Sequence, residues 1–344
     1  MSKRKYMNRA LELAQLGKGS VSPNPMVGCV IVHGDKIIGE GWHQKYGEQH
    51  AEVAALNNVK DKHLLKESTV YVTLEPCSHH GNTPPCADRL VSEKVKKVII
   101  CNTDSNPLVN GKGIEKLKNA GIAVDLDFLS AAGKQLNKRY FSFTENKRPY
   151  IILKWAETAD GFIAKTNYDS KWISNAQSRK MVHQWRAQED AILVGTNTAH
   201  YDNPRLNVRD WKGENPIRIV IDRNLRLDSG LNVFDGSQQT ICYNLKKKSS
   251  GNNLEFVKLE NHHFFKSLFE DLHKRKILSV IIEGGAEILS SLIRKNMWDE
   301  ARIFKSLVKF EAGIAAPKMD YKYLIHEQEV LDNMLSIYEN KDKK

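Results

Sequence analysis

The residues His50-Ala51-Glu52 are followed 24 residues later by Pro76-Cys77, and eight further residues separate Cys77 from Cys86. One imidazole and two thiolates suit Zn²⁺, and three protein ligands leave the fourth position of a tetrahedral ion open to water. Glu52 would stand beside that water as a base rather than act as a fourth ligand. The stretch from 50 to 86 therefore predicts a catalytic zinc site.

The surrounding sequence predicts how the fold brings these residues together. Residues 68–74 are rich in β-branched residues and predict a strand, so that Cys77 would lie at the mouth of a sheet. The apolar pattern that follows Glu52 predicts a helix that begins at His50. A polar loop containing proline and glycine would then return the chain to Cys86.

Two plainer interpretations stay open. Cysteine is among the most buried residue types, so these residues could meet in a core by coincidence. A closed structural zinc site would need a fourth ligand, which His79 or His80 could supply. The pattern of His-x-Glu with a later Pro-Cys and a second Cys is nevertheless the signature of zinc-dependent nucleobase deaminases, and we favour that chemistry.

Length and composition indicate two domains and no membrane span. The chain has 344 residues, 41% of them hydrophobic, and no apolar run approaches the roughly 18 residues of a membrane helix. The basic N-terminus leads into an amphipathic stretch rather than the apolar core of an export signal. Five cysteines are an odd set, unlike a disulfide framework. We therefore expect a cytoplasmic protein with no membrane partner.

The formal net charge of +11 could attract nucleic acid. The excess is spread over scattered lysines and short runs such as 246–248, which are usually solvated surface. We therefore expect no nucleic-acid partner, and a small phosphorylated substrate would also favour some of these charges.

Strand and helix patterns alternate along the chain, which is typical of an α/β fold. The polar stretch 144–149 predicts a boundary between domains of residues 1–147 and 148–344. In the first domain we expect helices at 3–17, 113–120 and 130–143, and strands at 26–33, 36–42, 68–74 and 97–101, with a turn at Gly34-Asp35. In the second we expect strands at 150–156, 190–195, 217–222, 278–283 and 301–308, and helices at 175–187 and 286–295.

A strand at 278–283 runs into Gly284-Gly285 and then into a helix. Such glycines can bring backbone amides and a helix N-terminus close to a phosphate, although a Gly-Gly turn between a strand and a helix is more often a packing feature. The pattern lacks the Gly-x-Gly-x-x-Gly fingerprint of a Rossmann domain.

Together these motifs resemble the bifunctional deaminase-reductase family of riboflavin biosynthesis. The eight residues between the cysteines favour this family, because cytidine and tRNA-adenosine deaminases usually have two. The matching segments of the first half are 23–28, 41–43, 50–52, 75–81 and 83–86. Those of the second half are 153–154, 160–161, 170–173, 186–187, 190–195, 198, 202–206, 208–209, 283–285 and 313–317. The chain departs from the family pattern at Asn82, which replaces a usual arginine, at 157–159, and at Asn175, which replaces a frequent glycine.

The resemblance implies an N-terminal cytidine-deaminase-like domain of three layers and a C-terminal dihydrofolate-reductase-like domain. The first would use one zinc ion per chain to deaminate 2,5-diamino-6-ribosylamino-4(3H)-pyrimidinone 5′-phosphate. The second would use NADPH to reduce the ribosyl chain of the product, 5-amino-6-(5-phosphoribosylamino)uracil, to ribityl. We also expect a homo-oligomer.

Matched by position, the resemblance implies catalysis by Glu52 and metal binding by His50, Cys77 and Cys86. The implied cofactor-binding residues are Ala156, Trp172, Thr198, Asp202 and Gly285. The implied substrate-binding residues are Lys154, Ser170, Arg186, Leu206, Arg209 and Glu283, and the guanidinium forks of the two arginines suit the 5′-phosphate. Each has a plainer role, such as a core tryptophan, a turn-forming aspartate or a surface arginine.

Two other functions would fit part of the pattern. A nucleic-acid base deaminase with an appended binding domain would explain the zinc motif and the positive charge. A zinc-stabilised regulator, or a chain with one inactive domain, would explain the departures.

Overall fold

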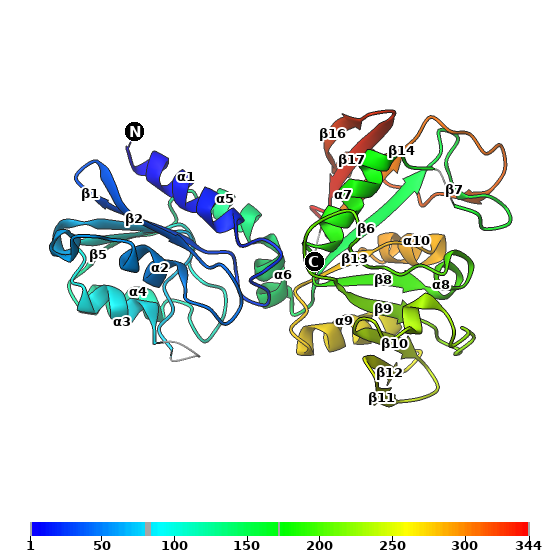
Figure 1. Cartoon of the computed structure of the whole chain (residues 1–344), viewed down its shortest axis with the longest axis horizontal. Helices are drawn as coiled ribbons and strands as arrows, with labels where there is room; N and C mark the ends of the chain where they lie inside the picture. Colours follow the sequence, from blue (N-terminus) through cyan, green and yellow to red (C-terminus); the bar gives the residue numbers. More distant parts are fainter. Residues whose placement is uncertain (1, 80–83, 171–172, 343–344) are drawn as a thin grey trace. The chain divides into compact units, whose positions relative to one another are not determined.

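The computed structural model describes residues 2–79, 84–170 and 173–342. It divides into two compact units, Met1–Lys147 and Arg148–Lys344, and each unit is built around its own sheet (Figure 1). Among the described residues, none of the helices combines the length and the apolar character that a membrane span requires.

The sheet of the first unit has five strands in the order β2-β1-β3-β4-β5. β1 pairs antiparallel with β2 and β3, whereas β3, β4 and β5 run parallel. The expected turn at Gly34-Asp35 is confirmed, since His33 of β1 pairs with Lys36 of β2. The strands are β1 (Gly28–His33), β2 (Lys36–Trp42), β3 (Thr69–Val72), β4 (Lys97–Ile100) and β5 (Ala123–Asp125).

Helices cover both faces of this sheet and complete three layers (Figure 1). Helix α1 (Ser2–Gln15) packs Tyr6, Met7 and Leu11 against one face. The other face is covered by helices that begin next to the metal-binding candidates His50 and Cys86. Because the apolar side chains of these helices are buried against the sheet, their packing also fixes the positions of His50 and Cys86. The elements on that side are α2 (Ala51–Asn57), the 3-10 helix η1 (Lys62–Glu67), α3 (Cys86–Ser92) and α4 (Lys112–Asn119).

The single helix expected at 130–143 is wrong. The chain forms α5 (Ser130–Leu136) and α6 (Lys138–Asn146), with the buried Asn137 between them. The Asn137 side chain accepts a hydrogen bond from Met26 N at 2.8 Å and donates one to Met26 O at 2.8 Å. This tertiary contact holds Asn137 outside the regular helix.

The sheet of the second unit has ten strands in the order β11-β12-β10-β9-β8-β13-β6-β14-β17-β16. Its seven inner strands are parallel: β6 (Tyr150–Glu157), β8 (Ala191–Gly195), β9 (Ile217–Ile221), β10 (Thr240–Asn244), β12 (Leu254–Lys258), β13 (Ser279–Ile282) and β14 (Glu300–Lys305). Every residue of β8 is buried, because helices cover both faces of a parallel sheet. The antiparallel strands are β11 (Ser249–Gly251), β16 (Leu324–Val330) and β17 (Asn333–Glu339).

Helices α9 and α10 pack on one face of this sheet, and α7 and α8 pack on the other. They span α7 (Ala176–Arg186), α8 (Thr196–Asp202), α9 (Phe264–Lys274) and α10 (Ala286–Arg294). Two 3-10 turns, η2 (Asn232–Phe234) and η3 (Tyr321–Tyr323), and a small sheet of β7 (Phe162–Ala164) and β15 (Ile314–Ala315) complete the unit. The strand expected at 301–308 spans Glu300–Lys305, and one further bond to β6, from Ser306 N to Glu157 O at 2.9 Å, follows its last residue.

Candidate functional site

Three secondary-structure ends bring the metal-binding candidates together in the first unit. His50 is the N-cap of α2, Cys86 is the first residue of α3, and Cys77 lies in the loop after β3. His50 Nδ1 lies 3.3 Å from Cys86 Sγ and 3.5 Å from Cys77 Sγ. The three ligand atoms all lie within 4.8 Å of one another.

These separations fit a tetrahedral zinc ion. Zinc bonds of about 2.1 Å to nitrogen and 2.3 Å to sulfur imply a nitrogen-to-sulfur edge of about 3.6 Å. Among the described residues this cluster has three members, and the exposed His79 is not one of them. His80 lies outside the described residues. The donor set thus matches a catalytic site with one open position better than a closed one.

The thiols of Cys77 and Cys86 are hydrogen-bonded to each other, and this bond shifts their pKa values in opposite directions. A hydrogen bond from Cys86 lowers the pKa of Cys77, and the same bond raises the pKa of Cys86. The Cys86 backbone N–H also donates to Cys77 Sγ at 3.3 Å. A thiolate at Cys77 in turn raises the pKa of His50. Of the two thiols, Cys77 is thus the one that ionises more readily, and the thiolate is the form of cysteine that binds a metal ion.

Glu52 is the second residue of α2, and its side chain is buried beside the cluster. The pKa of Glu52 is raised to about 7, chiefly by burial and also by the charge of Cys77, while His50 acts in the opposite direction. A carboxyl group of this kind can accept and return a proton near neutral pH.

Sequence reasoning missed a histidine that packs against the metal centre. The ring of His43 meets the ring of His50 edge-on, with their centroids 5.4 Å apart. His43 Nδ1 lies 3.1 Å from Gln49 O, so this nitrogen carries the proton, and Nε2 can accept from Asn24 Nδ2 at 3.1 Å. The sequence did point to this histidine, because Gly41-Trp42-His43 is one of the motifs that carry the family resemblance, but the motif gave His43 no role.

A second missed residue is Glu75, which is buried immediately before Pro76-Cys77. Its carboxylate accepts four backbone N–H groups of the loop and helix that follow β4. The donors are Asp104 N at 3.2 Å, Gly111 N at 3.0 Å, Gly113 N at 2.9 Å and Ile114 N at 3.3 Å. Glu75 therefore fastens the segment that carries Cys77 to the neighbouring parts of the unit.

The second unit contains a cavity of about 1120 Å³ at the ends of its parallel strands. Nine of the predicted reductase residues line it: Lys154, Ala156, Ser170, Arg186, Thr198, Asp202, Leu206, Glu283 and Gly285. Arg209 is exposed, follows the loop after Leu206 and is not part of this lining. Trp172 lies outside the described residues.

Three charged side chains, Lys154, Arg186 and Glu283, line the cavity and contact one another. Arg186 Nε and Nη2 donate to the two oxygens of Glu283 at 2.8 and 2.9 Å, and Lys154 Nζ lies 3.5 Å from Glu283 Oε2. Burial alone would raise the pKa of Glu283, but Arg186 and Lys154 lower it to about 2. Burial lowers the pKa of Lys154. The fork of Arg186 thus donates to Glu283, and its expected contact with the 5′-phosphate stays a prediction.

The glycine turn at Gly284-Gly285 directly follows Glu283 and also lines the cavity. Gly284 has φ 134° and Gly285 has φ 81°, and Gly285 caps the N-terminus of α10. A Cβ on Gly284 would lie 2.8 Å from Thr198 Oγ1, so only glycine leaves this space open. The first amides of a helix lack intrahelical partners, and those of α10 lie in residues that line the cavity. These features fit a phosphate-containing cofactor.

The departures from the family pattern have local structural roles. Glu157 accepts a hydrogen bond from Trp155 Nε1 at 2.9 Å, and the Thr158 hydroxyl donates to Asp160 at 2.5 Å. Asn175 caps α7 by accepting from Ser178 N at 2.8 Å. Asn82 lies outside the described residues.

Two family models match separate stretches of the chain. Residues 149–306 match the family model of the RibD C-terminal domain. Residues 1–102 match the cytidine and deoxycytidylate deaminase zinc-binding region.

Two curated relatives match most of the chain. The riboflavin biosynthesis protein RibD of Aquifex aeolicus is 39% identical, with 87% of this chain and 85% of the relative covered. RibD of Escherichia coli is 37% identical, with 87% and 86% covered.

Solved structures give the same result for the whole fold. The diaminohydroxyphosphoribosylaminopyrimidine deaminase/5-amino-6-(5-phosphoribosylamino)uracil reductase of Thermotoga maritima superposes with a TM-score of 0.89 at 34% identity, covering 98% of both chains. Acinetobacter baumannii RibD gives a TM-score of 0.89 at 32% identity over 99% of both. The chain therefore belongs to the RibD family, the bifunctional deaminase-reductases of riboflavin biosynthesis.

Proposed function

We propose that this chain catalyses two successive steps, one in each unit. The first is hydrolytic deamination of 2,5-diamino-6-ribosylamino-4(3H)-pyrimidinone 5′-phosphate. The second is reduction of the ribosyl chain of 5-amino-6-(5-phosphoribosylamino)uracil to ribityl. The observation that carries the proposal is the presence in one chain of a three-ligand cluster beside the buried Glu52 and of a separate cavity lined by Lys154 and Glu283.

In the deaminase unit, His50, Cys77 and Cys86 would hold one zinc ion per chain. Zinc supplies a Lewis acid that lowers the pKa of water toward neutrality. The Glu52 carboxylate would take one proton from the attacking water and give it to the ring nitrogen, and it would then take the proton of the added hydroxyl and give it to the leaving amine. The C–N bond to the exocyclic amine breaks, and ammonia leaves. His43 packs against the ring of His50 and keeps it in place.

In the reductase unit, the family implies a nicotinamide cofactor, and we propose NADPH. The cofactor supplies the hydride. The glycine turn at Gly284-Gly285 and the start of α10 would bind its phosphates. Lys154, partly shielded from water and held beside Glu283, would donate hydrogen bonds to oxygens of the substrate.

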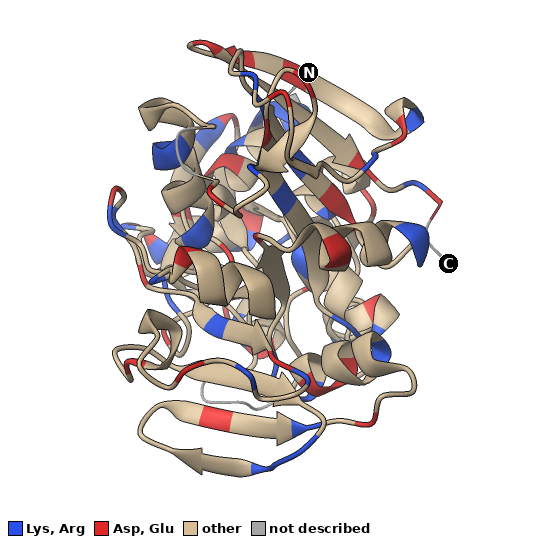
Figure 2. Cartoon of the chain, turned by 90° about the vertical axis from the view of Figure 1, so that its right-hand side faces the viewer, with Lys and Arg blue, Asp and Glu red and all other residues tan. Residues whose placement is uncertain are grey.

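The charge distribution favours a small substrate over nucleic acid. Figure 2 shows lysine and arginine interspersed with aspartate and glutamate along the elements in view. A phosphate-tracking groove would need cations gathered along one path. We propose a phosphorylated pyrimidine as the substrate, and we keep a cytoplasmic location and a homo-oligomer as expectations.

The test is a paired assay with the full-length protein. The diaminopyrimidinone phosphate and NADPH are supplied together, and ammonia release and NADPH oxidation are recorded in parallel. The proposal predicts ammonia first and NADPH oxidation after it. Ammonia release from cytidine or RNA, with none from the pyrimidinone, would support the base-deaminase alternative instead.

A further inference from the structure

Asn203 stands at the end of a helix that forms part of the reductase cavity. It is the C-cap of α8, in a left-handed conformation with φ 39° and ψ 55°. Asp202 before it and Pro204 after it both line the cavity, as does Thr198 one turn earlier. The left-handed conformation of Asn203 therefore ends α8 directly after Asp202 and turns the chain toward Pro204.

Asn232 holds Asn203 by two hydrogen bonds. Asn232 N donates to Asn203 Oδ1 at 2.7 Å, and Asn232 Nδ2 donates to Asn203 O at 2.8 Å. These two hydrogen bonds join the end of α8 to η2, which begins at Asn232, 29 residues after Asn203. Asn232 does not line the cavity.

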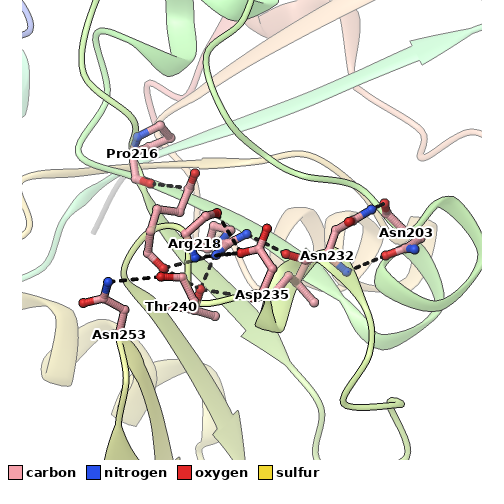
Figure 3. Close-up of polar contacts among 11 residues, drawn as sticks. Asn203, Pro216, Arg218, Asn232, Asp235, Thr240 and Asn253 are labelled. Carbon is pink, nitrogen blue, oxygen red and sulfur yellow. Dashed lines mark hydrogen bonds and ion pairs between the residues drawn. The ribbon is translucent and has the colours of Figure 1, made fainter.

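Asn232 is in turn fastened to Arg218, whose side chain is fully buried on the central strand β9. Arg218 Nη1 donates to Asn232 O at 2.7 Å, Nη2 donates to Asp235 Oδ1 at 2.7 Å, and Nε donates to Thr240 Oγ1 at 2.9 Å. Figure 3 shows this chain of contacts from Thr240 through Arg218 and Asn232 to Asn203. A buried guanidinium is costly unless its donors are paired, so the network fixes one position for η2.

Resting on the proposed function, we propose that Asn203 and Asn232 are positioning residues for Asp202 in cofactor binding. The buried Arg218 anchors η2 to the sheet, η2 fixes Asn203, and Asn203 sets the orientation of Asp202. On the cavity side the Ser170 hydroxyl lies 3.3 Å from Asp202 Oδ1 and 3.4 Å from Oδ2. The stacked rings of Tyr168 and Tyr201, 4.0 Å apart, join the same two segments.

The test uses full-length variants and steady-state reduction with NADPH. Asn232→Ala removes one donor to Asn203, and Asn203→Gly keeps the positive φ while removing the acceptor. Each is expected to raise KM for NADPH about threefold to tenfold, the effect of one lost hydrogen bond, with a smaller change in kcat. Asn203→Asp keeps the acceptor and the left-handed conformation, and is expected to restore KM to within twofold of the native value.

Asn252→Gly is the matched control, because Asn252 also has a positive φ of 46° but does not line the cavity. Circular dichroism and the midpoint of denaturant unfolding check that the reductase unit of each variant is folded, because ammonia release reports on the deaminase unit alone.

A double-mutant cycle separates positioning from a structural effect. If Asn232 acts through Asp202, then Asn232→Ala changes KM less than twofold in an Asp202→Ala background. The same three- to tenfold rise in that background, an unchanged KM in the native background, or an Asp202→Ala variant with native KM would each overturn the proposal. Absence of NADPH oxidation by the native protein would instead overturn the proposed function itself.

Discussion

The guanidinium of Arg186 and the carboxylate of Glu283 form a two-pronged ion pair, with Nε–Oε1 at 2.8 Å and Nη2–Oε2 at 2.9 Å. Arg186 Nη1 donates to Asn207 O at 3.2 Å, so all three nitrogens of the fork are engaged within the protein. The side chains of Arg186 and Glu283 are only 12% and 6% exposed. Arg186 therefore orients Glu283 beside Lys154.

We predict that Glu283→Gln lowers the free energy of unfolding by about 3 kcal/mol at pH 7, because it leaves two buried cations without their carboxylate. The pKa of Glu283 is held at about 2, below its ordinary value. Its contribution is fully present above the ordinary pKa and is lost as the pH falls through the folded value. Denaturant unfolding from pH 7 down to pH 2 should therefore show native and variant proteins converging below about pH 4. A difference that stays constant with pH would contradict this account of the three charged side chains.

The metal centre makes a second prediction. His50→Ala, Cys77→Ser and Cys86→Ser should each lose zinc and deaminase activity, because each removes one of three ligands. Cys101→Ser is the matched control: Cys101 is buried in the same unit and donates to Leu129 O at 3.3 Å, a bond that serine can keep. Elemental analysis should find about one zinc per chain in the native protein and the control. An active preparation without zinc would end the hypothesis.

Arg209 is the cation that we expect to bind the 5′-phosphate in the reductase. It is exposed on the loop after Leu206, and its Nη1 donates to Asn207 Oδ1 at 2.8 Å. Arg209→Ala should raise KM for the deaminated substrate about 10- to 100-fold, because a hydrogen bond to a charged group contributes about 1.5–3 kcal/mol. The kcat of the reductase and the release of ammonia should stay unchanged.

Two controls apply to this prediction. Lys212→Ala removes another exposed cation of the same stretch and should leave KM unchanged. With a substrate that lacks the phosphate, native protein and Arg209→Ala should have the same KM, and a persisting difference would mean that Arg209 acts on something other than phosphate.

Much of the fold could be predicted from local pattern. The apolar run at 191–195 forms the fully buried β8, and the two-residue turn at Gly34-Asp35 joins β1 to β2 as expected. The helix expected to begin at His50 does begin there, with His50 as its N-cap. In each case, the residues themselves determine the local structure.

What the sequence did not predict depends on distant partners. The break between α5 and α6 exists because Asn137 bonds Met26, 111 residues away. The hairpin of β16 and β17 was missed, because five residues of β16 are exposed and its sequence lacks apolar alternation. The pairing of Arg186 with Glu283 likewise joins residues 97 apart, which no local pattern reports. The family resemblance identified Arg186 and Glu283 as site residues, but it did not predict that they bind each other.

The most direct test of two independent sites in one chain is the Glu52→Gln variant, measured in two assays. The amide keeps the size of the side chain but cannot take the proton from water, so ammonia release from the diaminopyrimidinone phosphate should fall about 10²- to 10⁴-fold with zinc retained. NADPH oxidation with the already deaminated substrate should stay at the native rate, and the exposed Glu48→Gln should be native in both assays. Near-normal ammonia release, or loss of NADPH oxidation together with deamination, would contradict the account.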